Sequence, residues 1–381
     1  MKKGWQTKTL GEICTVDWGN TDLTKSAYVE GGKFLAVSAA GCDGRIGHKE
    51  HEKYTPVLSA IGAQCGRMFL PEEDFTAIKN TITLTPRDGT CTGRFLYQLL
   101  THVELPKRGA AQPFISKGDI QSFQVPVPPL AEQQRIVGLL DEAFEGLATA
   151  KANAEKNLQN ARDLFESHLQ SVFTQRGPGW VEKPFEELIE SNIIGLTKNS
   201  REQGEDKAWP YVKMNNITRD NRFDFSRFTC VDATAEEVSK FSLKDGDFLF
   251  NTRNSHELVG KSCIYESDSN DAVLYNNNIM RVRFQRGIDA RFVLLAFSSK
   301  GVADELNALK SGTTNVSAIY FKDLKSLVIP VPPIVEQKKI AAKLDALSEE
   351  TQRLARLYER KLAALEALKK SLLHQAFSGN L

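Results

Sequence analysis

The pattern of apolar and polar positions along the chain alternates between short strand-like runs and long helical stripes. Compact runs such as Phe34–Val37 and Thr81–Leu84 are rich in β-branched and aromatic residues and are typical of strands. From about residue 130, apolar residues recur at spacings of three and four over roughly 45 residues, which predicts a long amphipathic helix. The same succession returns in the second half of the chain.

A nearly identical sequence repeat accompanies this change of pattern. The segment Val125–Gln133, VPVPPLAEQ, returns about 204 residues later as Ile329–Gln337, IPVPPIVEQ. The match continues in fixed register as far as Phe173, which corresponds to Phe377. Because a match over roughly fifty residues cannot arise by chance, we infer an internal duplication with approximate two-fold symmetry.

The segments before the two helices match in outline rather than in sequence. Thr9 and Glu12 have the spacing of a capping box, which predicts a short helix near the start. The expected pairs of strands are Phe34–Val37 with Tyr211–Met214, Leu58–Ile61 with Phe248–Phe250, and Thr81–Leu84 with Ile279–Val282. The expected pair of shorter helices is Arg94–Leu100 with Arg291–Phe297.

Each long helix is expected to begin near its last proline, Pro129 or Pro333, because proline is tolerated in the first turn of a helix. Neither helix can bury its apolar stripe alone, so we expect the two helices to pair antiparallel. The residues expected to pack between them are Ile136, Leu140, Leu147, Leu158, Phe165, Ile340, Leu344, Leu347, Leu354, Leu362 and Leu365, and Leu368 continues the second stripe.

These patterns predict an α+β protein with two similar α/β domains separated by two long antiparallel helices that form a coiled coil. The expected boundaries are 1–127 for the first domain, 128–176 for the first long helix, 177–331 for the second domain and 332–381 for the second long helix. The alternative of two unrelated surface helices is disfavoured because the apolar stripes are in register across the repeat.

Composition narrows the class of protein. The chain has 41% hydrophobic and 25% charged residues, and no stretch approaches the roughly 18 apolar residues of a membrane span, so we expect a cytoplasmic protein. Six scattered cysteines without Cys-x-x-Cys spacing argue against a disulfide framework or a zinc finger. The net charge is +1, with about +2 and about −2 on the two globular segments, so nucleic-acid binding would depend on locally placed cations.

Motifs of catalysis are weak or missing in the sequence. Gly260–Ser262 ends like a phosphate-binding loop, but Ser255 stands where that motif needs glycine. The chain also has no G-x-G-x-x-G fingerprint and no Asn/Asp-Pro-Pro-Tyr/Phe segment of adenine methyltransferases. His48 and His51 have no further His or Cys nearby, which favours a solvated loop over a metal site. We therefore expect a protein that is not an enzyme and has no cofactor or metal.

The residues resemble a known family, the DNA-specificity subunits of type I restriction-modification enzymes. The resemblance covers essentially the whole chain. It rests on the repeated P-V-P-P-x-x-E-Q-x-x-I before each long helix and on Gly246–Ser255 followed by Leu258–Lys261, a pattern typical of the family's target-recognition domains. It implies a non-catalytic subunit of host defence that reads double-stranded DNA and docks methyltransferase subunits, two of them expected, for adenine N6 methylation. A restriction subunit joins the full enzyme and cleaves unmodified DNA.

The resemblance and the helical spacer together predict a bipartite DNA site. A rigid spacer would hold two readers at a fixed separation, so we expect two different short blocks with an unread gap, roughly one 34 Å turn from centre to centre. The exposed helix faces and the Pro-Pro segments are the expected docking surface for methyltransferase. Two alternatives stay open: a coiled-coil scaffold whose end domains bind proteins or other ligands, and a variant that works without a restriction subunit.

The candidate DNA-binding residues are polar side chains that can contact base edges, as Arg or Lys does with guanine and Asn or Gln does with adenine. Asn-rich loops are also ordinary turn chemistry, so the loops as groups are stronger candidates than any single residue. In the first domain the candidates are Ser38, Arg45, Gln64, Arg67, Lys79, Asn80, Arg108 and Gln112. In the second they are Lys213, Asn215, Asn216, Arg219, Arg222, Asn251, Arg253, Asn254, Lys261, Asn277, Asn278, Thr314 and Asn315. Among them Arg67, Arg108 and Lys261 suit phosphates better than bases.

Overall fold

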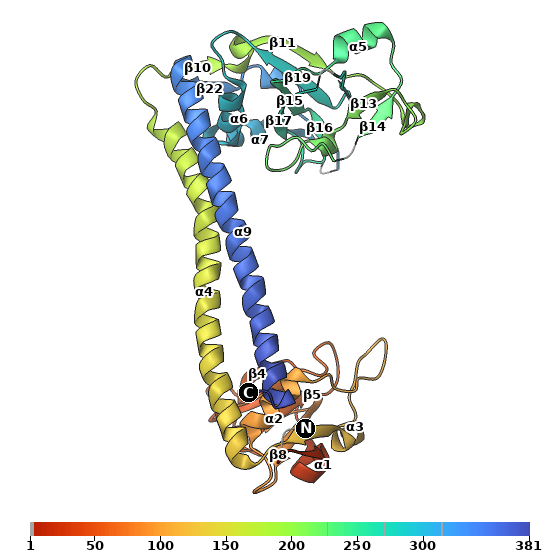
Figure 1. Cartoon of the computed structure of the whole chain (residues 1–381), viewed down its shortest axis with the longest axis vertical. Coiled ribbons are helices and arrows are strands. Elements are labelled where there is room, and N and C mark those ends of the chain that lie inside the picture. Colours follow the sequence, from red (N-terminus) through yellow and green to blue (C-terminus); the bar gives the residue numbers. More distant parts are fainter. Residues whose placement is uncertain (1–3, 227, 270, 314) are drawn as a thin grey trace. The chain divides into compact units, whose positions relative to one another are not determined.

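The structure is a computed structural model that describes residues 4–226, 228–269, 271–313 and 315–381 (Figure 1). The chain forms two compact units. Unit 1 combines the N-terminal part of the chain as far as Asn157 with Leu357–Leu381, and unit 2 spans Leu158–Arg356. Each unit therefore contains one globular domain and segments of both long helices.

Unit 1 is built on a four-stranded antiparallel sheet and a smaller three-stranded sheet. The first has the order β2-β8-β5-β6, with β2 Cys14–Trp18, β8 Thr81–Pro86, β5 Val57–Ser59 and β6 Met68–Phe69. The second has the order β4-β3-β7, with β4 Gly41–Ile46, β3 Phe34–Ser38 and β7 Phe75–Ala77, and its β3–β7 pair is parallel. The remaining elements are β1 Gln6–Thr9, which pairs with β9 Gln124–Val127, and the helices α1 Leu10–Ile13, α2 Gly93–His102 and α3 Lys117–Ser122.

Unit 2 repeats this plan with additions. Its antiparallel sheet has the order β11-β19-β15-β17, with β11 Ile189–Ile194, β19 Ile279–Phe284, β15 Asp247–Asn251 and β17 Ser262–Tyr265. The second sheet has the order β12-β14-β13-β18, with β12 Gln203–Gly204, β14 Thr229–Val231, β13 Trp209–Val212 and β18 Leu274–Tyr275, and its β13–β18 pair is parallel. The other strands are β10 Val181–Pro184, paired with β22 Val328–Val331, and a small sheet of β16 Arg253–Asn254, β21 Ser317–Ala318 and β20 Ser311–Gly312. The shorter helices are α5 Ala235–Phe241, α6 Ala290–Ser298, α7 Lys300–Ala308 and α8 Phe321–Leu324.

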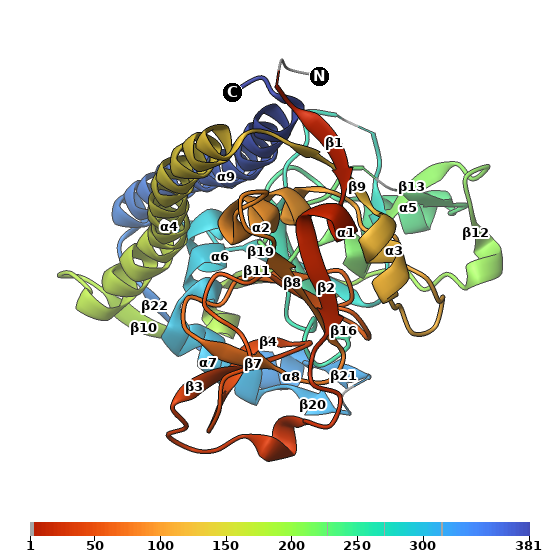
Figure 2. The same ribbon diagram turned by 90° about the horizontal axis from the view of Figure 1, so that it is seen from below.

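The helices α2 and α6 begin and pack in the same way. The Thr92 hydroxyl accepts the Phe95 N–H at 3.3 Å before α2, and the Asp289 carboxylate accepts the Phe292 N–H at 2.9 Å before α6. Figure 2 shows α2 beside the C-terminal end of α9, where Phe95 packs edge to face on Phe377 with ring centroids 5.6 Å apart. Burial of each such side chain stabilises the fold by about 1.5–3 kcal/mol.

Equivalent backbone hydrogen bonds confirm the internal repeat. The Ala60 N–H donates to Asn80 O at 2.9 Å, and the Thr252 N–H donates to Asn278 O at 2.8 Å. The Ile115 N–H donates to Ala60 O, and the Ile319 N–H donates to Thr252 O in the same way. The Gly66 N–H donates to Ser59 O, and the Gly260 N–H donates to Asn251 O. The two domains therefore share one framework.

The same bonds correct two of the predicted strand pairings. Thr81 corresponds to Ile279 as predicted, since Gly19 and Gly195 donate to these two residues. Ser59 pairs with Thr81 across the sheet as Asn251 pairs with Ile279, so Ser59 corresponds to Asn251. Leu58 therefore corresponds to Phe250, and the prediction was wrong by two positions. Val37 likewise matches Val212 rather than Met214. A shift of two keeps every side chain on its own face of the sheet, so the polarity pattern alone could not detect it.

The long helices are α4 Leu130–Gln175 and α9 Ile334–Ser378. Each begins immediately after its last proline, whose carbonyl accepts the N–H of Gln133 or Gln337 at 3.0 or 3.1 Å. The expectation that each helix begins near its last proline is confirmed, and the proline lies immediately before the first helical residue.

The two helices lie side by side and antiparallel within each unit (Figure 1). In unit 1, Arg135 contacts the carbonyl of Leu381 at 2.7 Å and Lys151 pairs with Glu366 at 2.8 Å, so α9 runs backward as α4 runs forward. In unit 2, Ala161 and Phe165 line one groove with Thr351 and Ala355, and Val172 lines another with Ile340 and Leu344. The predicted fold class, two α/β domains with two long antiparallel helices, is confirmed.

Most of the predicted stripe residues lie inward. Ile136, Leu140, Ile340 and Leu344 are buried, and Leu147, Leu158, Phe165, Leu347, Leu354, Leu362 and Leu365 are half-buried. Leu368 is an exception, because its side chain is 47% exposed. At this point α9 packs through Leu365 and then through Leu372, Leu373 and Ala376, which leaves Leu368 on the edge of the stripe.

Within the part of the chain that the structure describes, no helix is long and apolar enough to cross a membrane. The cysteines there are all free thiols. No group of three or more His, Cys, Asp or Glu side chains within the same residues could hold a metal ion.

Candidate DNA interface

A buried glutamine fixes the junction between the first domain and its long helix. Gln133 is fully buried, and its Nε2 donates to Thr90 O at 3.0 Å and Pro128 O at 2.9 Å. Its Oε1 accepts the Thr92 N–H at 2.9 Å. This side chain thereby ties the start of α4 to the segment that leads into α2.

Gln337 makes the equivalent contacts in unit 2. Its Nε2 donates to Gly287 O at 3.0 Å and Pro332 O at 2.8 Å, and its Oε1 accepts the Asp289 N–H at 2.8 Å. Gln133 and Gln337 occupy equivalent positions of the repeat. This repetition is the feature of the sequence from which a structural role of the glutamine could have been inferred. Buried amides are retained where every polar atom has a partner.

In unit 2, Asn251 holds two neighbouring loops together. It lies at the end of β15 and is fully buried, and its Nδ2 donates to Arg253 O at 3.1 Å and Asn278 O at 2.9 Å. Its Oδ1 accepts a hydrogen bond from Asn254 Nδ2 at 2.9 Å. The turn at residues 276–278 is therefore fixed beside the segment that begins β16.

Two further loops join this segment. Arg253 and Asn254 of β16 pair with Ala318 and Ser317 of β21, and β21 pairs in turn with Ser311 and Gly312 of β20. On the other side, Lys261 Nζ donates to Met214 O at 2.9 Å and also to Ile217 O. Residues 213–222, 251–261, 276–278, 311–313 and 315–318 thus form one cluster of loops in unit 2, the unit 2 loop cluster.

Several polar candidates lie on the surface of the unit 2 loop cluster. Arg219 is largely exposed and contacts Glu257 at 3.5 Å, and Arg222 is held by Gln352 at 2.5 Å. The exposed candidates in this unit are Asn215, Arg219, Arg222, Arg253, Asn277 and Asn315. Lys213, Asn254 and Asn278 are half-buried, and Thr314 lies outside the described residues.

Three candidates of unit 2 point inward and use their polar atoms within the protein. Asn251 is occupied as described, and Asn216 accepts the Lys213 N–H at 2.9 Å and donates to Asp224 O at 3.0 Å. Lys261 is half-buried, and burial lowers its pKa. Their polar atoms bond within the protein, and the sequence had placed all three among the residues expected to contact DNA.

Unit 1 has an equivalent cluster of loops, built around residues 59–67. Ala60 bonds to Asn80, Ile61 bridges to Phe114, and the Gly62 N–H donates to Pro113 O at 3.0 Å. This unit 1 loop cluster brings together the candidates Gln64, Arg67, Lys79, Asn80, Arg108 and Gln112. All of these except Asn80 are exposed.

The arginines of the unit 1 loop cluster have contacts within the protein. Arg67 lies 5.4 Å from the centre of the Phe69 ring and donates to Gln64 at 3.3 Å. Arg108 pairs with Asp119 at 2.5 Å on the surface. The Arg108 side chain is 62% exposed, whereas the Asp119 side chain is 16% exposed.

The other two candidates of the first domain, Ser38 and Arg45, lie on β3 and β4 in the second sheet. Ser38 is buried and donates to Asp43 at 2.9 Å, and Arg45 pairs with Glu73 at 2.7 Å. Burial by itself raises the pKa of Asp43, but hydrogen bonds from Lys25, Tyr28 and Ser38 lower it below its usual range. Ser38 therefore uses its hydroxyl within the protein, and Arg45 is paired on the surface of the second sheet.

Comparison with known proteins agrees with this arrangement. The pattern that defines the family described as "Type I restriction modification DNA specificity domain" matches residues 2–158 and 178–360. The chain is 24% identical over 359 residues to the type I restriction enzyme EcoKI specificity subunit of Escherichia coli strain K12, covering 91% of this chain and 74% of the relative. It is 23% identical over 414 residues to the type I restriction enzyme EcoDI specificity subunit of Escherichia coli, covering 99% and 88%.

Solved structures share the fold. The HsdS subunit from Thermoanaerobacter tengcongensis matches with a TM-score of 0.63 and 20% identity, over 100% of this chain and 98% of that chain. A chain from a structure described as showing complex assembly and conformational transition of the type I R-M system matches with a TM-score of 0.73 and 20% identity, over 100% and 99%.

Proposed function

The chain belongs to the type I restriction modification DNA specificity family, whose members are non-catalytic specificity subunits, and from this premise we propose that it reads a bipartite DNA site with one domain for each half. The observation that carries the proposal is the pair of equivalent loop clusters. The shared backbone bonds place Ile61 where Arg253 stands, and Lys79 where Asn277 stands. Since equivalent positions differ in hydrogen-bonding groups, the two half-sites differ in sequence.

The exposed side chains of each cluster are the proposed base readers. Arg253 is exposed at β16, and Asn277 and Asn315 are exposed on the neighbouring turns of unit 2. In unit 1 the proposed contacts are Gln64, Lys79 and Gln112, with Asn80 beside them and Arg67 and Arg108 on phosphates. A good bidentate contact supplies about 1–3 kcal/mol of discrimination against the wrong base.

We also propose that methyltransferase subunits dock on the long helices, one for each copy of the repeat. Leu164 and Leu368 occupy equivalent positions of α4 and α9, and both are large apolar side chains with exposures of 50% and 47%. Because a leucine is exposed at the same position in both copies of the repeat, we propose that each one contacts a partner subunit. In the full enzyme a restriction subunit joins this complex and cleaves unmodified DNA.

The test is an exchange of one reader. Residues 1–127 are replaced by the first domain of another family member, the chain is co-expressed with its methyltransferase subunit, and N6-methyladenine is mapped across the host genome. The expected result is a methylated site with one half changed and the other half and the gap retained. A change in both halves, or methylation without any sequence preference, would contradict the two-reader proposal, and the second result would favour a scaffold.

A further inference from the structure

The two units differ most in the connection that follows the first strand of the parallel pair in the second sheet, β3 in unit 1 and β13 in unit 2. In unit 1 this connection, between β3 and β4, is residues 39–40, whereas in unit 2 the described residues between β13 and β14 are 213–226 and 228. The longer connection begins with the segment 213–222, which carries the exposed candidates Asn215 and Arg219. Unit 2 therefore has a long loop at this position, whereas unit 1 has a short turn.

Lys261 ties this loop to the rest of the unit 2 loop cluster. Its Nζ donates to the backbone carbonyls of Met214 and Ile217, which are 47 and 44 residues away in the chain. Carbonyl oxygens satisfy an ammonium group that is removed from water, and burial lowers the pKa of this lysine. With two of its three donors on the loop, the side chain points into the protein.

The counterpart of Lys261 in unit 1 behaves differently. Ser59 N–H donates to Arg67 O as Asn251 N–H donates to Lys261 O, so Arg67 and Lys261 are equivalent. The Arg67 side chain lies over Phe69 and donates to Gln64 on its own segment. The Lys261 side chain therefore contacts a second loop in unit 2, where that loop is long, whereas Arg67 of unit 1 contacts its own segment.

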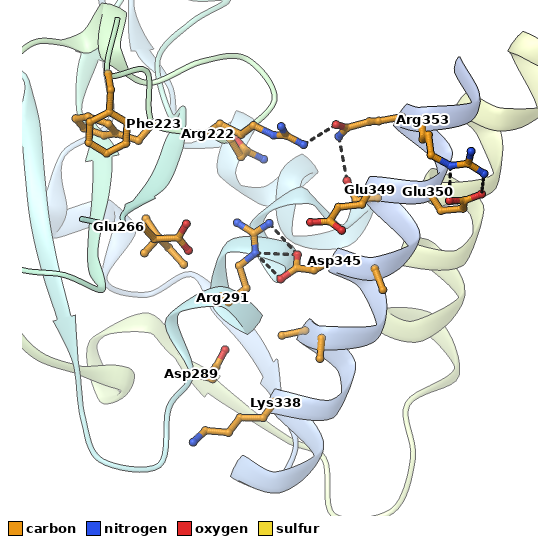
Figure 3. A pocket seen from close by; sticks show the side chains of 18 of the residues that line it. Arg222, Phe223, Glu266, Asp289, Arg291, Lys338, Asp345, Glu349, Glu350 and Arg353 are labelled. Atoms are coloured by element: carbon orange, nitrogen blue, oxygen red, sulfur yellow. Dashed lines mark hydrogen bonds and ion pairs between the residues drawn. The ribbon is translucent and has the colours of Figure 1, made fainter. Parts of the chain in front are cut away.

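The far end of the loop is fixed by other contacts. Asn221 Nδ2 donates to Ser298 Oγ of α6 at 2.8 Å. Arg222 donates to Gln352 of α9 at 2.5 Å, and Figure 3 shows this arginine reaching toward the helix. The loop is therefore held at both ends, and Lys261 holds the end next to the segment that carries Arg253.

We infer that Lys261 is a positioning residue for reading the second half-site. Its side chain holds the segment 213–222 beside the segment that carries Arg253, and it does not bind a DNA phosphate. The inference rests on the proposed function for its effect on DNA, but the loop contact itself is independent of DNA. When Lys261 is replaced, Asn215 and Arg219 lose their fixed position relative to Arg253. The protein then still binds DNA but distinguishes the second half-site less well.

The first experiment measures the loop without DNA. Hydrogen exchange of the amides of Asn216, Thr218 and Asp224, which bond within the loop, is compared in the full chain and in Lys261→Met. We expect exchange to become faster by about tenfold or more in Lys261→Met, and Lys261→Arg to restore much of the protection because it can still donate to both carbonyls. Lys244→Met, at an exposed lysine, is the control for lost charge. Unchanged exchange in Lys261→Met would overturn the inference.

The second experiment uses the complex with methyltransferase and DNA duplexes that carry the mapped site or an altered second half. Positioning predicts that Lys261→Met reduces the affinity ratio between these duplexes, leaves discrimination at the first half intact and leaves the salt dependence unchanged. A phosphate contact predicts a uniform loss for both duplexes and a salt slope smaller by about 1, which would overturn the inference. If the unaltered protein shows no sequence preference, the proposed function fails, while the exchange result still decides the role of Lys261.

Discussion

Arg291 of α6 and Asp345 of α9 form an ion pair, with the guanidinium Nη2 2.7 Å from the carboxylate Oδ1 (Figure 3). Unit 1 repeats it as Arg94 and Asp141 at 3.1 Å. The pair is about one-third exposed in unit 2, so water screens it. We predict that Asp345→Asn lowers the free energy of unfolding by less than about 1 kcal/mol, measured by urea denaturation. A loss of several kcal/mol would show that this pair is a principal tie between domain and helix.

The buried glutamines are expected to matter more than the ion pairs. Replacing Gln337 with Leu leaves the Asp289 N–H and the carbonyls of Gly287 and Pro332 without their partner. Each unsatisfied buried group costs about 1–3 kcal/mol, so urea denaturation should show a clear loss of stability. Gln134→Leu, at an exposed position one residue after Gln133, is the matched control. Equal effects of the two substitutions would contradict the stabilising role of the buried Gln337 hydrogen bonds.

The helix pairing can be tested with a charge in its interior. Leu140 and Leu344 are buried, and an aspartate at either position would be desolvated without a partner, which costs several kcal/mol. We predict that Leu140→Asp or Leu344→Asp lowers the melting temperature strongly, as followed by circular dichroism. Unchanged melting would refute the observed packing.

The exposed leucines separate docking from folding. Leu368→Asp places a charge on the surface of α9, so we predict a melting temperature close to that of the unaltered chain but weaker assembly with methyltransferase subunits. The measurement is the mass of the complex by light scattering after gel filtration. The same substitution at Leu164 should remove the second contact. Assembly that withstands both changes would move the docking surface elsewhere.

Arg253 is the sharpest test of base reading. If its exposed guanidinium grips a guanine, Arg253→Ala should weaken discrimination at one position of the second half-site by about 1–3 kcal/mol. Competition binding with single-base variants of the mapped site gives this number. A loss that is equal for all sequences and sensitive to salt would assign Arg253 to a phosphate.

A histidine in unit 1 gives a pH dependence with a defined sign. His51 packs on Phe75 with ring centroids 5.1 Å apart, and burial lowers its pKa below the ordinary value of 6.5. The unfolded chain therefore binds the proton more readily, so the contribution of His51 to stability is present above about pH 6.5 and is lost as the pH falls below it. We predict that His51→Phe reduces the fall in unfolding free energy between about pH 7 and pH 5, measured by urea denaturation at each pH.

The sequence by itself determined the elements and the plan. The close match between Val125–Gln133 and Ile329–Gln337 revealed the duplication, and the prolines located the start of both long helices. Apolar residues at helical spacing predicted the pairing of α4 with α9, because a stripe of that length has to be buried. These features are local or repeated, so they can be read along one chain.

The tertiary structure decided which polar side chains face outward and which loops meet. Lys261 looked like a phosphate ligand by type, but it lies against Met214, 47 residues away in the chain. Asn251 looked like a base reader and lies buried between Arg253 and Asn278. The polarity of a residue states what bonds it can make, whereas its partner depends on segments that folding brings together from distant parts of the sequence.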